Sequence, residues 1–337
     1  MIMSEKEKFD VVLLSGGGIK GIGELGVLLY YQEKGMLDLD HVQEFVGTSI
    51  GSMINLLMVC GYTPMEIFIK IYTTRDIFNF MDFNDIWSVF TNYGIMSIQP
   101  LINIVEEMVK AKFGSLPTFL ELKNLTGKLF TITSTNVNKA RSEDFNYETR
   151  PHLGVVNAVK MSCNLPVIFH KIKYHGDYWV DGAVADGFPY TSVKNKLGRI
   201  LGVVVAGTDR EKYKDTFINY LYQMITIPMN VITHLRTKNI GKNVKLITVI
   251  FDDVPIIKFA MESKKKMDMF MKGYHCAQRE EEKELLLIKK WTFYDTRGID
   301  EATPISERLT LDFWSDPLDP IGGGWEDEWQ KFDKEEL

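Results

Sequence analysis

The segment 45–51 reads Phe-Val-Gly-Thr-Ser-Ile-Gly and places Ser49 between two glycines, Gly47 and Gly51. An apolar pair opens the segment, and a helix-competent run, 52–60, follows it. A strand, a sharp turn and a helix form the setting in which the serine of a G-x-S-x-G motif becomes a nucleophile. The glycines permit the turn, and the helix N-terminus favours negative charge near the hydroxyl. The motif is common, so its interpretation depends on the rest of the chain.

A second glycine-rich turn, 16–21, reads Gly-Gly-Gly-Ile-Lys-Gly and follows the apolar run 9–14, which predicts a buried strand. The turn satisfies G-x-G-x-x-G in the strand-to-helix position that a dinucleotide site requires. Asp38 and Asp40 follow it in the chain, but both precede the strand expected at 41–46. A ribose-binding acid belongs at the end of that strand, so a nucleotide-binding oxidoreductase is kept only as an alternative.

The same glycines also suit ester chemistry. Consecutive glycines at a helix N-terminus expose backbone amides, so Gly16, Gly17 and Gly18 are candidates for an oxyanion hole. Two neighbouring strand–turn–helix units would bring this turn and Ser49 to the same edge of a parallel sheet. A turn with a purely structural role is the remaining interpretation.

A nucleophilic serine needs a proton acceptor, and the sequence offers an aspartate rather than a histidine. None of the histidines after Ser49 sits in a glycine-framed turn; they are His152, His170, His175, His234 and His275. Only 48 residues precede Ser49, whereas an α/β-hydrolase usually places several strands before its serine. Asp181 ends the apolar strand expected at 178–180, and the small residues Gly182 and Ala183 follow it. Asp181 is therefore the candidate base, with an ordinary turn aspartate as the alternative.

Taken together, the three motifs at 16–21, 47–51 and 181–183 resemble the patatin-like phospholipase family. The segment 158–169 also resembles the helix and proline segment that precede the aspartate in that family. The resemblance covers roughly residues 8–206, and the combination of motifs is specific although each motif alone is not. It implies a three-layer α/β/α sandwich with a mainly parallel central sheet.

The resemblance also implies the chemistry and the roles of individual residues. It implies a lipid acyl hydrolase of the phospholipase A or lysophospholipase type, with Ser49 as nucleophile and Asp181 as general base. The amides of the glycine turn would form the oxyanion hole. The other motif residues carried over are Lys20, Gly21, Gly47, Gly51, Gly182 and Ala183. No metal and no cofactor is expected, and a non-catalytic lipid-binding relative is the alternative.

This chain departs from the family pattern at three places. Ser15 stands where relatives often have Asp or Gly, and Ala183 ends the third motif in place of Gly. Residues 186–189 replace an Asn-rich proline segment, which concerns the shape of the loop rather than the chemistry.

Composition limits the classes of partner and location. Of 337 residues, 45% are hydrophobic and 25% charged, as in ordinary globular proteins. A formal net charge of −6 without a basic half disfavours nucleic acid as a partner. Cys60, Cys163 and Cys276 are too widely spaced for a disulfide framework or metal site and favour a reducing compartment. No run is long enough for a signal peptide or a membrane span, so we expect a cytoplasmic protein with peripheral membrane contact and a phospholipid or other fatty-acyl ester substrate.

We expect three regions: a catalytic core at 8–206, helices and a strand at 207–321 that complete the same domain, and an acidic Trp-containing tail at 322–337. In the second region, apolar residues recur at helical spacing; they are Phe217, Leu221, Tyr222, Ile225, Met229 and Ile232. A core helix that packs on the sheet is the main interpretation of this pattern, and a membrane-facing helix is the alternative.

Overall fold

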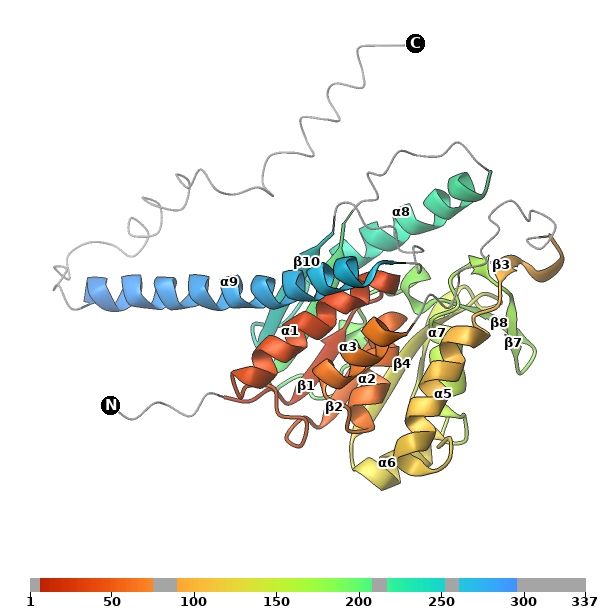
Figure 1. The fold of residues 1–337 in the computed structure, drawn as a ribbon, viewed down its shortest axis with the longest axis horizontal. Coiled ribbons are helices and arrows are strands. Elements are labelled where there is room, and N and C mark those ends of the chain that lie inside the picture. The colour runs from red at the N-terminus through yellow and green to blue at the C-terminus, as the bar shows by residue number, and fades with distance from the viewer. Residues whose placement is uncertain (1–6, 75–89, 208–216, 252–260, 296–337) are drawn as a thin grey trace, which may run out of the picture. The chain divides into compact units, whose positions relative to one another are not determined.

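The computed structural model describes residues 7–74, 90–207, 217–251 and 261–295 (Figure 1). Contacts between residues divide the chain into two units, Met1–Glu282 and Lys283–Leu337. Of the second unit, only the end of the last helix is described. The predicted tail at 322–337 lies outside the described residues, and the predicted boundaries at 206 and 321 stay predictions.

Five parallel strands form the centre of the main sheet, in the order β10-β9-β1-β2-β4. They are β1 (Val11–Leu14), β2 (Glu44–Thr48), β4 (Leu129–Asn136), β9 (Ile200–Ala206) and β10 (Val244–Ile250). At least one helix lies between every two consecutive strands of this set along the chain, as parallel strands require. The predicted α/β class with a mainly parallel sheet is confirmed.

Short antiparallel strands extend the sheet beyond β4. They are β5 (Arg141–Phe145) and β8 (Asp177–Val180), which both pair with β4, and β7 (Ile172–Tyr174), which pairs with β8. A separate parallel pair consists of β3 (Gly94–Met96) and β6 (Val167–Phe169). Val180 lies opposite Thr135, while Thr133 lies opposite Thr48. Strand β8 therefore ends close to where β2 ends.

The central strand β1 is buried on both faces because alternate side chains point to opposite sides of a sheet. Val12 and Leu14 belong to the larger core, and Val11 and Leu13 belong to a smaller core on the other face. Phe188 and Val193 contribute to the smaller core from the segment around the short helix η3 (Tyr190–Ser192). Burial on both faces fits the predicted layered sandwich.

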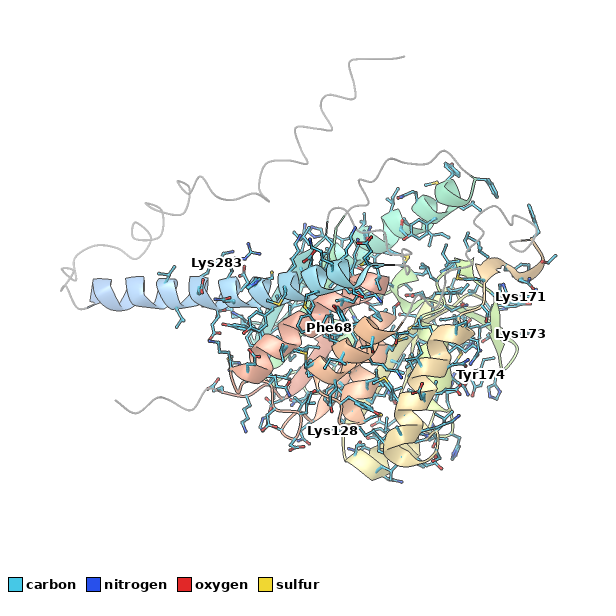
Figure 2. The ribbon with its side chains drawn as sticks, viewed as in Figure 1. Phe68, Lys128, Lys171, Lys173, Tyr174 and Lys283 are labelled. Carbon is cyan, nitrogen blue, oxygen red and sulfur yellow. The ribbon has the colours of Figure 1, made fainter. Side chains whose placement is uncertain are left out.

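Helices cover the larger core. Those of the first half are α1 (Ile22–Glu33), α2 (Ile50–Val59), α3 (Pro64–Thr73), α5 (Gln99–Phe113), α6 (Phe119–Thr126) and α7 (Val155–Ser162). Thr63 begins α3 as a capping box, in which its side chain accepts from the amide of Glu66 and Glu66 accepts in return. Phe68 of α3, which is labelled in Figure 2, stacks on Phe270 of the final helix with 4.0 Å between ring centroids.

The last two helices are α8 (Phe217–Lys238) and α9 (Ser263–Asp295). In α8, Tyr222 and Met229 of the predicted stripe are buried, which confirms a face that packs on the protein. Phe217, which the same pattern included, is exposed and does not belong to this buried side. The reason is that α8 carries a second apolar face. None of the described helices is long and apolar enough to cross a membrane.

Candidate active site

Ser49 occupies a strained turn between β2 and α2. Its backbone angles are φ 54° and ψ −127°, a left-handed conformation that a side chain with a Cβ rarely adopts. A methyl group on Gly47 would lie 2.7 Å from the carbonyl carbon of Gly51, and one on Gly51 would lie 2.5 Å from the carbonyl oxygen of Ser15. Both glycines are therefore required by close backbone approach, and the predicted strand–turn–helix setting is confirmed.

Buried hydroxyl groups hold the strained turn in place. The amide of Ser49 donates to Oγ of Ser162 at 2.8 Å, and that hydroxyl donates to the carbonyl of Thr133 at 2.7 Å. Oγ of Ser52 donates to the carbonyl of Ser49 at 2.6 Å. The end of α7, strand β4 and the first turn of α2 thus fix both backbone polar groups of Ser49. Such surrounding bonds are what a strained residue needs to persist.

The side chain of Ser49 meets Asp181. Oγ of Ser49 donates to Oδ2 of Asp181 at 2.5 Å, although the two residues are 132 positions apart in the chain. Asp181 follows β8 directly, and its amide donates to the carbonyl of Asn164 at 2.8 Å. Its other carboxylate oxygen accepts from the amide of Ala183 at 2.9 Å. The structure therefore brings together the serine and the aspartate of two separate motifs.

Burial sets the acidity of Asp181. The residue is 3% exposed, and loss of hydration raises its pKa from the ordinary 3.8 to about 7. The hydrogen bonds from Ser49 and Ala183 act in the opposite direction. A carboxylate with such a pKa is a stronger base than an exposed aspartate and still ionises near neutral pH. All six histidines lie in the described part of the chain, and none of them hydrogen-bonds Ser49 there.

The glycine turn packs against the same two residues. A methyl group on Gly16 would lie 3.0 Å from Cβ of Ala183 and 3.3 Å from Cβ of Ser49. One on Gly17 would lie 2.2 Å from a methyl of Val205. All three sequence motifs therefore converge at the carboxyl ends of the parallel strands.

The amides of the turn differ in their partners. The amide of Gly16 donates to the carbonyl of Gly187 at 3.0 Å. For the amides of Gly17 and Gly18, the described residues provide no hydrogen-bond acceptor. The two glycines adjoin the short helix η1 (Gly18–Gly21) at its N-terminus, where amides are characteristically unpaired. The turn therefore contains two amides, those of Gly17 and Gly18, that have no acceptor among the described residues.

The remaining motif residues support these groups. Lys20 is buried, and its amine donates to the carbonyl of Gly207 at 2.9 Å, which ties the turn to the end of β9. A methyl group on Gly21 would lie 2.5 Å from Ile50, and one on Gly182 would lie 2.2 Å from the carbonyl oxygen of Thr133. Among the described residues, no group of three side chains is arranged to hold a metal ion.

Sequence comparison assigns the chain to a family. The profile of the patatin-like phospholipase family matches residues 12–194, a range that contains all three motifs. The chain belongs to the patatin-like phospholipase family.

Relatives of this patatin-like chain include viral and bacterial proteins. It is 28% identical to the probable lipid hydrolase 463L of Invertebrate iridescent virus 6, over 84% of this chain and 89% of that protein. It is 26% identical to the uncharacterized protein YqhO of Bacillus subtilis, over 83% and 98% of the two chains. VipD from Legionella pneumophila shares the fold with a TM-score of 0.53 at 17% identity, over 81% of this chain and 66% of VipD. The family and the named viral relative support a lipid ester hydrolase.

Sequence reasoning missed the supporting residues of this patatin-like site. Ser162 and Asn164 lie within the segment 158–169 that carried the resemblance, but their roles depend on partners far away in the chain. Their signal was the presence of small polar residues in an otherwise apolar segment. Asp186 was missed as well: its carbonyl accepts from Oγ1 of Thr48 at 3.0 Å, and burial raises its pKa to about 6.

Ser15, which departs from the family pattern, joins three elements below the glycine turn. Its hydroxyl donates to Oε1 of Glu24 at 3.0 Å and accepts from the amide of Val205 at 3.0 Å. Glu24 is fully buried in α1, and loss of hydration raises its pKa well above the ordinary 4.5. The Ser15 hydroxyl thus connects the end of β1 with α1 and β9.

Proposed function

We propose that this chain is a lipid acyl hydrolase in which Ser49 is the nucleophile and Asp181 is the general base. The observation that supports the proposal most directly is the 2.5 Å hydrogen bond between Oγ of Ser49 and Oδ2 of Asp181 in a buried, strained turn. The substrate class is a phospholipid or another fatty-acyl ester, in keeping with the family. The proposed reaction is hydrolysis through an acyl-enzyme.

In the first half of the reaction, Oγ of Ser49 attacks the ester carbonyl while Oδ2 of Asp181 accepts the hydroxyl proton. The carbonyl oxygen becomes negative, and the amides of Gly17 and Gly18 donate to it. Each such donor is typically worth about 3 kcal/mol of transition-state stabilisation. Gly16, the first glycine of the turn, has no part in this role because its amide already donates to the carbonyl of Gly187. Asp181 then returns the proton to the leaving alcohol.

In the second half, water attacks the acyl-serine ester. Asp181 accepts a proton from the water, the same two amides stabilise the second tetrahedral intermediate, and the proton returns to Oγ of Ser49 as the fatty acid leaves. One carboxylate thus serves as base and as acid in both halves. Its burial supports this double role because a pKa near 7 makes both protonation states accessible.

The test combines a covalent probe with lipid hydrolysis. Purified full-length wild type, Ser49→Ala and Asp181→Asn are treated with a fluorophosphonate and assayed on phosphatidylcholine and lysophosphatidylcholine. Ser115→Ala serves as the matched control because this serine is exposed beyond the end of α5. We expect labelling and hydrolysis with wild type and the control, and loss of both with Ser49→Ala. Hydrolysis that persists in Ser49→Ala would refute the assignment, and a wild type that binds lipid without cleaving it would identify a non-catalytic relative.

A further inference from the structure

Helix α8 carries an exposed apolar face opposite the face that packs on the protein. Tyr222, Thr226 and Met229 are buried on the inner side. On the outer side, six apolar side chains each expose 50–54% of their surface; they are Phe217, Tyr220, Met224, Ile227, Val231 and Leu235. At about 100° per residue, these six fall within about 80° of arc, directly opposite the buried face. The helix is therefore apolar on two sides, and only one side has a protein partner among the described residues.

The packed side of α8 lies against the loop that follows the candidate base. It contacts the short helix η2 (Gly182–Val184), which begins directly after Asp181. A methyl group on Gly187 would lie 2.0 Å from Oγ1 of Thr233, so the loop and α8 are in close contact. Arg236 forms an ion pair with Asp186 at 3.4 Å. Figure 1 shows α8 running outward from the sheet. The helix that carries the exposed face is thus in direct contact with the loop that follows Asp181.

The charge of this region differs from that of the whole chain. Residues 217–251 contain no aspartate and no glutamate, although the chain as a whole has a net charge of −6. The segment carries four cations: Arg236, Lys238, Lys242 and Lys245. Lys238 is exposed and falls within the arc of the apolar face, and Lys242 is exposed just beyond the helix. An apolar helix face with cations and without acids is complementary to an anionic lipid surface.

A second copy of the chain fits this face less well. In a two-fold dimer the same patch meets itself, so the interface would contain Lys238 from both copies and no acidic residue of α8 to pair with it. Cations without an acidic partner at an interface oppose association. A membrane offers the opposite: hydrocarbon for the six apolar side chains and anionic headgroups for the lysines. Tyr220 adds a side chain that is apolar in its ring and polar at its end, as is common at membrane interfaces.

We propose that the outer face of α8 docks on an anionic phospholipid surface, with the helix lying in the interface. The proposal rests on the proposed function only in the choice of lipid as the occupant. Docking through α8 would hold the loop of Asp181 one helix diameter, roughly 10 Å, from the surface that contains the substrate. Hydrolysis of vesicle lipid should then depend on this face, whereas hydrolysis of a dissolved short-chain ester should not.

Binding can be measured apart from catalysis. Full-length protein with Ser49→Ala is floated with phosphatidylcholine vesicles that either contain or lack phosphatidylglycerol. In this background, Met224→Glu and Val231→Glu place a charge on the outer face, and both side chains are half exposed, so the fold can accommodate it. Leu125→Glu is the matched control, since Leu125 of α6 is 60% exposed and belongs to another element. Circular dichroism checks the fold of each variant.

We expect binding to anionic vesicles that is unchanged by Leu125→Glu and at least about tenfold weaker in both α8 variants, since a charged side chain is costly in the interface. Lys238→Glu should weaken binding to anionic vesicles only. Equal binding of the α8 variants and the control would overturn the proposal. Light scattering that shows a dimer in wild type and a monomer in Met224→Glu would overturn it as well and assign the face to self-association.

The same α8 variants, made in protein that retains Ser49, separate this proposal from the proposed function. Met224→Glu should cleave a dissolved short-chain ester like wild type and lose at least about tenfold in the cleavage of anionic vesicles. If wild type cleaves neither substrate, the proposed function fails while the flotation result still decides the role of α8. If vesicle cleavage survives in both α8 variants, docking through α8 fails while the assignment of Ser49 stands.

Discussion

Replacing Asp181 with asparagine is expected to abolish hydrolysis and to change how stability depends on pH. Burial raises the pKa of Asp181 in the folded protein from the ordinary 3.8 to about 7. The folded state therefore binds this proton more tightly than the unfolded state does. The stability that this proton contributes is fully present below the unfolded pKa, falls as pH rises, and is lost above the folded pKa. Asparagine has no such proton, so this part of the pH dependence disappears.

The size of the effect follows from the shift. Each pKa unit corresponds to about 1.4 kcal/mol, so a shift of about three units corresponds to about 4 kcal/mol between pH 4 and pH 7. Measurements between pH 5 and pH 7 capture two of these units, or about 3 kcal/mol. The free energy of unfolding of Asp181→Asn minus that of wild type should rise by this amount over that range and then level off. The absolute difference also contains the change in the hydrogen bond between Ser49 and the new amide, so the rise with pH is the quantity to compare.

Denaturant unfolding at pH 5, 6, 7 and 8 measures this difference. Other buried acids such as Glu24 and Asp186 titrate in both proteins, so their contributions cancel in the subtraction. Asp177→Asn, at the start of the strand that precedes Asp181, is the matched control, because a hydrogen bond from Asn136 and nearby Lys139 lower the pKa of Asp177. The stability that Asp177 gains from these contacts is lost only when pH falls through its lowered pKa, so the control should run parallel to wild type from pH 5 to 8.

Parallel curves for wild type and Asp181→Asn between pH 5 and pH 7 would refute the reasoning, since they would mean that Asp181 titrates outside this range. The kinetic counterpart is a kcat/KM for a dissolved ester that rises about tenfold per pH unit below pH 7 and is level above it. The carboxylate is the active form of a general base, so activity and the ionisation of Asp181 should share one midpoint. A rate that is flat from pH 5 to 8 would exclude Asp181 as the base.

Two further predictions concern groups around the site. Ser162→Ala should lower the free energy of unfolding by about 1–3 kcal/mol, because it leaves the buried amide of Ser49 without its partner. In steady-state kinetics, kcat should fall by a larger factor than KM rises. An unchanged kcat would argue against a positioning role for Ser162. Thiol titration of the native protein should modify half-buried Cys276 alone, and Cys60 and Cys163 should react only after unfolding. The reason is that burial raises the pKa of Cys60 to about 12 and that of Cys163 well above its ordinary range. Rapid modification of all three thiols would contradict the burial of Cys60 and Cys163.

Local sequence was sufficient where local geometry decides the outcome. Gly47 and Gly51 stand on either side of the sharp turn at Ser49, at positions that leave no room for a side chain. This requirement is visible in the pentapeptide itself. The parallel pairing of β1 and β2 was likewise predictable, because each is an apolar run followed by a glycine-containing turn and a helical stretch. The turn at 16–21 and the position of Asp181 after a strand belong to the same class of local signals.

Interactions between distant segments could not be predicted in this way. Ser162 lies 113 residues from Ser49, and nothing in its own neighbourhood shows that it accepts the amide of that residue. The direction of β8 depends on its pairing with β4, whereas its three apolar residues fit a parallel strand equally well. In α8, apolar residues occur on two sides, so helical spacing alone could not decide which side would be buried.

The close approach of Gly16, Ser49 and Ala183 has a consequence for how such a chain can change over generations. The three backbones leave room for the methyl of Ala183, while a second methyl on Gly16 would sit 3.0 Å from it. Gly16→Ala and Ala183→Gly should therefore be strongly epistatic, with the first tolerated best after the second has occurred. The order of substitutions in two segments far apart in the gene is then constrained by a space that holds a single methyl group, directly beside Ser49.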